Sequence, residues 1–321
     1  MNVQSPARVA PARPVLRTVC VLGAIACVVG LFLAPGFGRS QGKPDLVWGR
    51  QGTQNGDLER PRAVAIDAQD HLYIVDFTAR IQVYDRDGHY LGPTWQTPDY
   101  RKGRPSGLSI DRDGNLIVSD SHYSCWRIYS PAGDELRVFG GKEGTAPGEL
   151  GYVSDVVQDA DGCWYVAEFG CNERISKFDP DGKFLKCWGS HGTEPGQFQR
   201  ARALALGPDG LLYVADSCNH RVQVFDRDGN LVRCWGEPGG EPGQLKLPYD
   251  VAFGPKGELY VAERENHRVQ KFTVFGESLG CWGAPGRGPG QLHDPWALAV
   301  DSKGYVHVID TENHRVQRIK F

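Results

Sequence analysis

The sequence predicts an all-β fold, a six-bladed β-propeller of four-stranded antiparallel blades, and three observations support it. A block of about 47 residues recurs along the chain in six copies. Each copy holds four short apolar runs that are separated by glycine-containing turns. The repeat region begins with the fourth run of a copy and ends after the third run of another copy, as expected for a ring that closes on itself.

The repeats are clearest in the C-terminal half of the chain. The stretch "CNHRVQ" begins at Cys218, and "ENHRVQ" begins at Glu265 and again at Glu312, so the step is 47 residues each time. A period of this length is typical of architectures that repeat one supersecondary unit. Weaker copies of the segment that contains this stretch begin at Leu72, Leu116 and Trp164.

Each copy has the composition of a four-stranded sheet. In the fourth copy, an apolar run at 203–206 is followed by the turn "GPDG" at 207–210 and then by "LYVAD", "RVQVFD" and "LVRCWG". Short runs rich in Val, Tyr, Phe and Trp that are split by Asp-Gly turns predict antiparallel strands. One such sheet cannot bury both of its faces, whereas six sheets packed around an axis can.

The two ends of the repeat region predict how the ring closes. Residues 45–48 match the fourth strand of a blade, and the last copy stops after its third strand at Phe321. We therefore expect residues 45–48 to supply the outer strand of blade six and residues 45–321 to form one propeller domain. Closure of this kind protects the edge strands from pairing with other chains.

Residues 1–44 form a separate N-terminal segment with five basic residues and no acidic residue. An apolar, uncharged stretch at 18–37 predicts one hydrophobic helix, which is short for a membrane span and long for the core of a signal peptide. We expect either an uncleaved membrane anchor or a cleaved export signal, followed by a linker. In both cases the body lies outside the cytoplasm, periplasmic or extracellular, and it is secreted if the signal is cleaved.

The charge of the chain argues against one class of partner. The formal net charge is −3, and without the basic residues of the N-terminal segment the body carries −8. Proteins that bind nucleic acid through broad electrostatic contact are basic on the binding surface. We therefore expect no nucleic-acid partner.

A pair of opposite charges recurs in every copy. The second strand ends with an acid, and an arginine stands at the start of the third strand. Because both flank one hairpin turn, we expect them to pair across it with bidentate hydrogen bonds and to act as structural clips. The six pairs are Asp76 with Arg80, Asp120 with Arg127, Glu168 with Arg174, Asp216 with Arg221, Glu263 with Arg268, and Asp310 with Arg315.

The Asn-His-Arg triplets do not predict a shared metal site. Packed sheets lie about 10 Å apart, so the loops that carry His220, His267 and His314 are too far from one another for one zinc ion. The "DRDGN" stretches at 111–115 and 226–230 have glycine at the fourth position, whereas a calcium loop needs it at the sixth. We interpret them as turns and expect neither a bound metal nor a cofactor.

Side chains at the start of each inner strand converge on the axis of a propeller. One interpretation is an axial site for a small anionic or carbohydrate-like ligand or an acidic loop of a partner. The other is that the arginines pair with Asp155 and Asp250 and plug the channel. The six positions are Arg62, Ser106, Ser154, Arg202, Tyr249 and Trp296.

The body contains seven cysteines, and most are expected to be small buried apolar residues. Cys187, Cys234 and Cys281 occupy one position of the outer strand in successive blades, too far apart for disulfides. Cys171 and Cys218, in neighbouring loops, are the pair that could form one.

The repeated segments resemble the NHL repeat family. The resemblance is carried by "PGQF" at 195–198, "LYVAD" at 212–216 and "NHRVQ" at 219–223, and it covers residues 46–321, most closely in blades four to six. It implies a six-bladed propeller and says little about function.

Three functions are consistent with the resemblance. The first is an exported or membrane-anchored, non-catalytic binding or sensor module, with a protein or a small ligand on the loop face. The second is a metal-dependent enzyme that resembles the peptide-amidating lyases or lactonase-like hydrolases. Its relatives hold metal near the start of the inner strands, where the six axial positions here include no His, Asn, Asp or Glu. The third is RNA binding, which the acidic body opposes.

Overall fold

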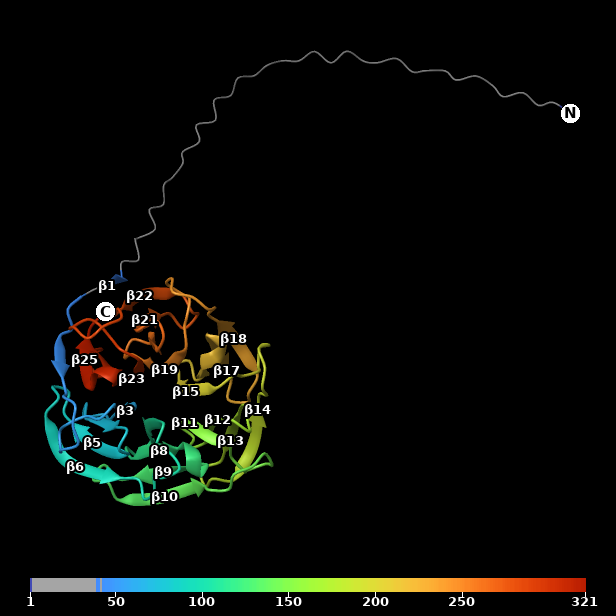
Figure 1. The fold of residues 1–321 in the computed structure, drawn as a ribbon. Helices are drawn as coiled ribbons and strands as arrows, with labels where there is room; N and C mark the ends of the chain where they lie inside the picture. Colours follow the sequence, from blue (N-terminus) through green and yellow to red (C-terminus); the bar gives the residue numbers. More distant parts are fainter. Residues whose placement is uncertain (2–38, 41) are drawn as a thin grey trace, which may run out of the picture. The chain divides into compact units, whose positions relative to one another are not determined.

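The computed structural model describes Met1, residues 39–40 and residues 42–321. Within this part of the chain, the repeats form six antiparallel sheets arranged as blades around a central axis (Figure 1). In blades one to five the strands of a copy follow chain order from the axis to the rim, and the first copy runs from β3 to β6. In blade six the N-terminal β2 (Leu46–Trp48) takes the rim position beside β25. The prediction of a six-bladed propeller with four-stranded blades is therefore confirmed.

The strands have similar lengths in all blades. Blades one to three contain β3 (Ala63–Ile66), β4 (Leu72–Val75), β5 (Arg80–Tyr84), β6 (Tyr90–Gln96), β7 (Gly107–Ile110), β8 (Leu116–Asp120), β9 (Cys125–Tyr129), β10 (Glu135–Gly140), β11 (Tyr152–Gln158), β12 (Trp164–Phe169), β13 (Arg174–Phe178) and β14 (Phe184–Trp188). Blades four to six contain β15 (Ala201–Leu206), β16 (Leu212–Asp216), β17 (Arg221–Phe225), β18 (Leu231–Trp235), β19 (Pro248–Phe253), β20 (Leu259–Glu263), β21 (Arg268–Phe272), β22 (Ser278–Trp282), β23 (Pro295–Val300), β24 (Val306–Asp310), β25 (Arg315–Ile319) and the N-terminal β2 (Leu46–Trp48).

The hydrophobic core is divided among the six interfaces between neighbouring blades. Tyr213 and Val222 of blade four, for example, pack with Val251 and Phe272 of blade five in one cluster. Because neighbours cover both faces of a blade, β16 is buried along its whole length, whereas the outer strand β14 alternates between half-buried and exposed residues. Each fully buried Val or Phe side chain contributes about 1.5–3 kcal/mol.

The turns between the third and fourth strands are closed by an aspartate in blades one, three and four, and by Ser130 and Thr273 in blades two and five. In blade four, Oδ1 of Asp226 accepts hydrogen bonds from the backbone N–H groups of Asp228 (2.8 Å) and Asn230 (2.9 Å). Gly229 adopts a φ of 80°, which the turn requires and few other residues tolerate. The "DRDGN" stretch at 226–230 is therefore a turn, as expected. The stretch at 111–115, between the first and second strands of blade two, is a turn of the same kind, in which Asp111 accepts from the N–H groups of Asp113 and Asn115.

The ring closes as the sequence predicts. Strand β2 pairs antiparallel with β25, with Leu46 opposite Arg318 and Trp48 opposite Val316. Trp48 also packs on Tyr84 of blade one, with ring centroids 4.8 Å apart. The first and last described strands of the propeller thus complete one blade.

A further short strand lies outside the six blades. Strand β1 (Arg39–Ser40) pairs in parallel with β22, the outer strand of blade five. The sequence did not predict this pairing. The indole N–H of Trp282 donates to the Gly42 carbonyl (2.9 Å) beside it. The predicted hydrophobic helix at 18–37 lies outside the described residues, and among those that are described no helix is long and apolar enough to cross a membrane.

Candidate axial binding site

A backbone irregularity aims side chains at the axis in blades three to six. The pairing of the first two strands shifts by one residue near the start of the inner strand. Such a bulge inserts an unpaired residue, bends the strand and re-aims the side chain. The inserted residues are Ser154, Arg202, Tyr249 and Trp296. Arg62 and Ser106 stand at the matching place, immediately before β3 and β7.

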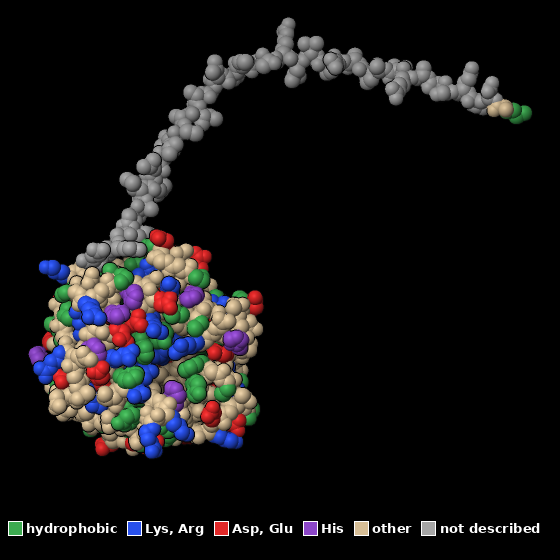
Figure 2. All heavy atoms as spheres, viewed as in Figure 1, with side chains coloured by type: hydrophobic (Ala, Val, Ile, Leu, Met, Phe, Trp, Pro, Cys, Tyr) green, Lys and Arg blue, Asp and Glu red, His purple; other side chains and the backbone are tan. Residues whose placement is uncertain are grey.

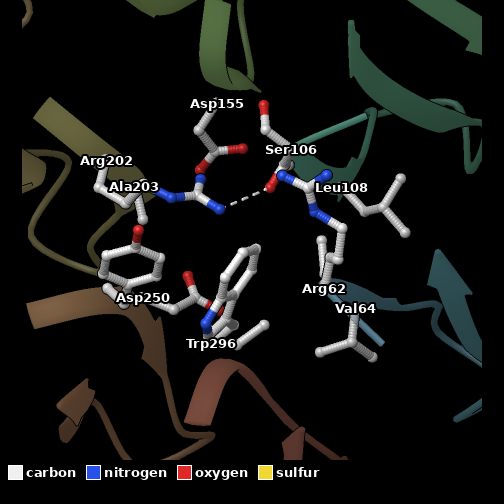
Figure 3. A pocket seen from close by; sticks show the side chains of 13 residues that line it. Arg62, Val64, Ser106, Leu108, Asp155, Arg202, Ala203, Asp250 and Trp296 are labelled. Carbon is white, nitrogen blue, oxygen red and sulfur yellow. Dashed lines mark hydrogen bonds between the residues drawn. The ribbon is translucent and has the colours of Figure 1, made fainter. Parts of the chain in front are cut away.

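Five of the six predicted residues line one small axial cavity of about 20 Å³ (Figure 3). They are Arg62, Ser106, Arg202, Tyr249 and Trp296, and they share the cavity with Asp155 and Asp250. A space of this size holds about one water molecule or a comparably small chemical group. The register read from the repeats therefore brings these side chains together, and Ser154 is the one that does not reach the cavity.

The two serines hold blades together. The Ser106 hydroxyl donates to the carbonyl of Ser154 in blade three (2.9 Å), and the Ser154 hydroxyl donates to the carbonyl of Ala201 in blade four (2.6 Å). Ser154 is fully buried. Their hydroxyl groups are thus used between blades, which argues against a role in ligand contact.

The two axial arginines approach each other from opposite blades (Figure 3). Arg202 is 5% exposed, and its Nη2 donates to the Ser106 carbonyl (3.0 Å) across the axis. The Arg62 guanidinium lies 5.0 Å from the Trp296 ring, and its buried Nε has no hydrogen-bond partner. Among the described residues neither arginine forms an ion pair with a carboxylate, so the alternative interpretation, in which they pair with Asp155 and Asp250, is wrong.

The two aspartates bind backbone groups instead. Asp155 accepts from the N–H groups of Val156 (2.9 Å) and of Leu204 in the next blade (2.9 Å). Asp250 accepts in the same way from Val251 (2.8 Å) and from Leu298 (2.8 Å) of the following blade. Burial raises the pKa of both carboxyls to about 7, although these N–H groups and the Arg202 charge act in the opposite direction.

Electrostatic repulsion is concentrated at Arg62. Burial, followed by the charges of Arg202 and Arg104, lowers the pKa of Arg62 to about 10. Burial alone would raise the pKa of Tyr249, but the guanidinium groups of Arg202, Arg200 and Arg264 outweigh it, and the net shift is downward. The downward shift of the Tyr249 pKa, and the part of the Arg62 shift that comes from neighbouring arginines, reflect an excess of positive charge at the axis.

Further arginines and aromatic rings surround the mouth of the cavity. Arg104 lies 4.1 Å from the Phe77 ring, and Arg200 lies 5.2 Å from the Phe169 ring. Neither forms an ion pair with a carboxylate among the described residues, whereas Arg264 pairs with Asp294. Figure 2 shows Lys and Arg side chains gathered at the centre of this face. We call Arg62, Arg104, Arg200 and Arg202 the axial arginine cluster.

The predicted clip residues meet in every blade, and each ion pair has its two partners in the same repeat. In most blades one guanidinium nitrogen contacts the carboxylate and the others bind carbonyls of the preceding loop. Arg221, for example, donates from Nη1 to Thr193 (2.6 Å) and from Nη2 to Gln197 (2.8 Å). The expected bidentate contact occurs in blade five, where Arg268 reaches both oxygens of Glu263 through Nε (2.6 Å) and Nη2 (3.4 Å). The shortest nitrogen–oxygen distances are 2.6 Å for Arg80–Asp76, 3.0 Å for Arg127–Asp120, 3.0 Å for Arg174–Glu168, 2.8 Å for Arg221–Asp216, 2.6 Å for Arg268–Glu263 and 2.7 Å for Arg315–Asp310.

Blade two builds its clip from a different register. Asp120 stands opposite Cys125, whereas Asp216 of blade four stands opposite Arg221 itself. Arg127 therefore comes from two residues further along the third strand and also binds Glu135 (2.8 Å). Sequence spacing alone could not show this, because the charge is retained although its position has moved.

The histidines of the triplets link neighbouring blades. Nδ1 of His220 accepts from the backbone N–H of Leu247 (3.1 Å), and Nδ1 of His267 accepts from that of Asp294 (3.1 Å). Nδ1 of His314 in blade six accepts from Arg60 of blade one (3.0 Å). Each histidine has a φ between 50° and 55°. The triplets therefore share no metal, as expected, and the sequence did not predict the inter-blade bond, because no local pattern signals it.

The described residues contain no group of three or more His, Cys, Asp or Glu side chains placed to hold a metal ion. Most of the seven described cysteines were expected to be buried, but only Cys125 and Cys281 are, and Cys187 and Cys234 are exposed. Cys171 and Cys218 are exposed free thiols, so they form no disulfide with each other. The outer strands face solvent on one side, which explains the exposure of their cysteines.

The NHL repeat family model matches residues 198–225, 245–272 and 292–319, which lie in blades four to six. Over 121 residues the chain is 37% identical to peptidyl-glycine alpha-amidating monooxygenase A of Xenopus laevis, covering 35% of this chain and 13% of that protein. It is 30% identical to NHL repeat-containing protein 3 of Homo sapiens over 178 residues, 48% of each chain. The chain thus spans at most about half the length of these curated relatives.

Solved structures share the fold at low sequence identity. A streptogramin B lyase superposes with a TM-score of 0.59 and 14% identity, covering 86% of this chain and 87% of that one. A gluconolactonase of Xanthomonas campestris gives a TM-score of 0.61 and 15% identity, covering 81% and 86% of the two chains. At these identities the likeness concerns the propeller alone.

Proposed function

Because this chain carries NHL repeats on a six-bladed β-propeller, we propose that it is a non-catalytic binding module that holds a ligand or partner on the face where the inner strands begin. The observation that supports the proposal is the axial arginine cluster, whose four charges have no carboxylate partner among the described residues. Arg202 is buried and the other three are half-buried, and charges that are withdrawn from water are normally paired. A charged cluster left open on a rigid ring of strands is suited to recognition.

We further propose that the module acts outside the cytoplasm. The basis is the uncharged apolar stretch at 18–37 behind three arginines, which is suited to an export signal or an anchor. If the stretch is an uncleaved anchor, the protein fractionates with membranes and is released when the segment is removed. Fractionation of cells that express the full chain, followed by N-terminal sequencing of the purified protein, distinguishes an anchor from a cleaved signal.

A ligand screen tests the binding function. Compounds are ranked by the rise in melting temperature of the purified full chain, and each hit is repeated with Arg62→Ala and with Arg202→Ala. We expect hits whose effect disappears in these variants and persists in Arg137→Ala, an exposed arginine on the outer strand β10. If the axial variants change stability but no binding event, the proposed binding face is wrong.

A metal-dependent enzyme is the second candidate, and the 37% identity to an amidating monooxygenase over 121 residues is the observation in its favour. The matched segment is 13% of that protein, so its activity does not transfer on this ground. Metal analysis of the purified chain separates the candidates. One tightly bound zinc or calcium ion per chain, lost when an axial residue is changed, would favour the enzyme over the binding module.

A further inference from the structure

We propose that the axial cavity is a carboxylate site, in which the head of an organic monoanion lies between Arg62 and Arg202 and its apolar body lies against Trp296. This inference rests on the proposed function, since it names the chemical class of the ligand that the face would hold. It selects an anion from the ligands that the sequence left open, namely an anionic group, a carbohydrate and an acidic loop.

The unpaired groups of the site are donors. Nε of Arg62, Nε of Arg200 and Nε1 of Trp296 are buried without a hydrogen-bond partner among the described residues. Leaving a buried donor unsatisfied costs about 1–3 kcal/mol, and more for a charged group. A carboxylate has acceptors and no donors. A neutral carbohydrate could accept hydrogen bonds from these donors but carries no charge to balance the arginines, so the observed imbalance favours the anion.

The charge balance points the same way. Asp155 and Asp250 line the cavity as well, but their oxygens already accept four backbone N–H groups. Against these two carboxyls stand the four arginines of the axial arginine cluster, and Arg264 at the rim is already paired with Asp294. A positive excess therefore remains even when both aspartates are ionised.

The size of the cavity limits the head group. A volume of about 20 Å³ admits only a small head group, and this disfavours a tetrahedral phosphate relative to a flat carboxylate. Guanidinium groups also match the geometry of a carboxylate with two parallel hydrogen bonds. Arg62 retains free donors for this purpose, whereas Arg202 already binds the Ser106 carbonyl (3.0 Å).

Two aromatic rings lie beside the arginines, and Trp296, which is half-buried, offers a surface to the rest of the ligand, whereas Tyr249 is only 3% exposed. The Tyr249 and Trp296 rings lie 5.5 Å apart, with Arg202 at 4.9 Å from the first and Arg62 at 5.0 Å from the second. Flat apolar groups stack on such rings. The expected ligand thus combines one carboxylate with an adjoining aromatic or aliphatic body.

Calorimetric titration of the full chain with small probes tests this inference. We expect benzoate to bind with a stoichiometry of one and benzyl alcohol, with the same ring and no charge, to bind about 10–100-fold more weakly, the effect of one charge-assisted hydrogen bond. Acetate and inorganic phosphate should also bind more weakly than benzoate. Equal affinity for benzoate and benzyl alcohol, tighter binding of phosphate, or no carboxylate binding at millimolar concentration would overturn the inference.

Two variants keep the test independent of folding. Arg62→Gln removes the charge of a residue that has no ion pair among the described residues, and we expect it to weaken benzoate binding about tenfold or more. The matched Arg137→Gln change on β10 should leave the affinity unchanged. Retained affinity in Arg62→Gln contradicts the inference. If benzoate does not bind but a different ligand binds the wild-type chain and no longer binds Arg62→Ala, the carboxylate assignment is wrong and the proposed function stands.

Discussion

Arg62 shows at the scale of one residue how a candidate function opposes stability. Its guanidinium is held among Arg202, Arg104 and the Trp296 ring without a carboxylate partner among the described residues. A pKa lowered to about 10 means that folding disfavours the charged form. Residues that are unfavourable in the unliganded fold are expected at sites shaped for a ligand.

Replacing Arg62 with methionine should therefore stabilise the unliganded protein. The charged form is penalised at every pH below about 10, so removing the charge is expected to raise the free energy of unfolding by about 1–3 kcal/mol near neutral pH. Urea denaturation measures this change in the free energy of unfolding. The same change at Arg80, whose ion pair with Asp76 is 2.6 Å long, should destabilise the protein. Equal losses for both variants would show that Arg62 is also held by favourable contacts.

Asp155 and Asp250 predict the sign of a pH effect. An unfolded aspartate loses its proton near pH 4, whereas these two lose it near pH 7, so the folded state binds more protons between these values. Their contribution to stability therefore falls as pH rises from about 4 to about 7 and stays low above it. We expect a fall of about 1–3 kcal/mol per carboxyl.

A double variant isolates that effect. In Asp155→Asn with Asp250→Asn, the loss of backbone hydrogen bonds lowers stability by an amount that does not depend on pH. The free energy of unfolding, measured by urea denaturation from pH 5 to pH 8, should accordingly fall less steeply than in the wild-type chain. Parallel curves for the two proteins would show that these carboxyls do not titrate in this range.

At the scale of the element, the hairpin between the second and third strands is the recurring unit. Its clip joins the two strands and also fixes the preceding loop, because Arg221 binds Asp216 and the carbonyls of Thr193 and Gln197. Its histidine then joins the hairpin to the next blade. The most similar parts of the repeats thus build the ring, and the variable parts are free for recognition.

Breaking one clip should cost more than breaking a surface ion pair. Arg221→Met leaves the fully buried Asp216 without its cation, and we expect a loss of about 3–5 kcal/mol. Lys186→Met removes an exposed pair with Asp228 and should cost less than about 1 kcal/mol. Chemical denaturation of both variants makes the comparison. Similar losses would mean that the clips are not structural.

The inter-blade histidine bond predicts a graded effect at position 267. His267→Ala removes the acceptor for the Asp294 N–H and places alanine at a φ of 50°. We therefore expect the free energy of unfolding to fall by about 1–3 kcal/mol. His267→Asn should lose less, because asparagine tolerates this φ and offers an acceptor. Thermal unfolding ranks the three proteins. An alanine variant as stable as the asparagine variant contradicts the role of the bond.

The whole molecule depends on closure of the ring. Strand β2 supplies the outer strand of blade six, and Trp48 fills the space beside Tyr84 of blade one. Without β2 the edge of β25 would be open to pairing with other chains. Closure therefore links the stability of blades one and six.

Two truncations test closure. A chain that starts at Gly42 keeps β2 and should lose less than about 1 kcal/mol relative to the full chain. A chain that starts at Gly49 lacks Leu46–Trp48 and should lose at least about 3 kcal/mol, the effect of deleting a large buried aromatic side chain, and should associate through β25. Denaturation and light scattering read out the two effects. A monomeric, equally stable Gly49 chain would show that closure is dispensable.

The sequence by itself determined the architecture of the propeller. The turn chemistry follows from residues near one another in the chain, and repetition made the same local pattern visible several times. The repeat period and the one-strand offset at 45–48 follow from comparing one copy with another. The convergence of Arg62, Arg202, Tyr249 and Trp296 followed from the common register of the inner strands. The pairing of each clip was also a local inference, since both partners flank one hairpin.

Only the tertiary structure decided the contacts that cross from blade to blade. These contacts include the carbonyl bonds of Arg202, the backbone bonds of Asp155 and Asp250, and the histidine bonds to the next blade. Such bonds join residues far apart in the chain, and whether they form depends on bulges and on distances of tenths of an ångström. Spacing in a sequence can place a side chain on the axis, but the partner it finds there depends on how the blades pack.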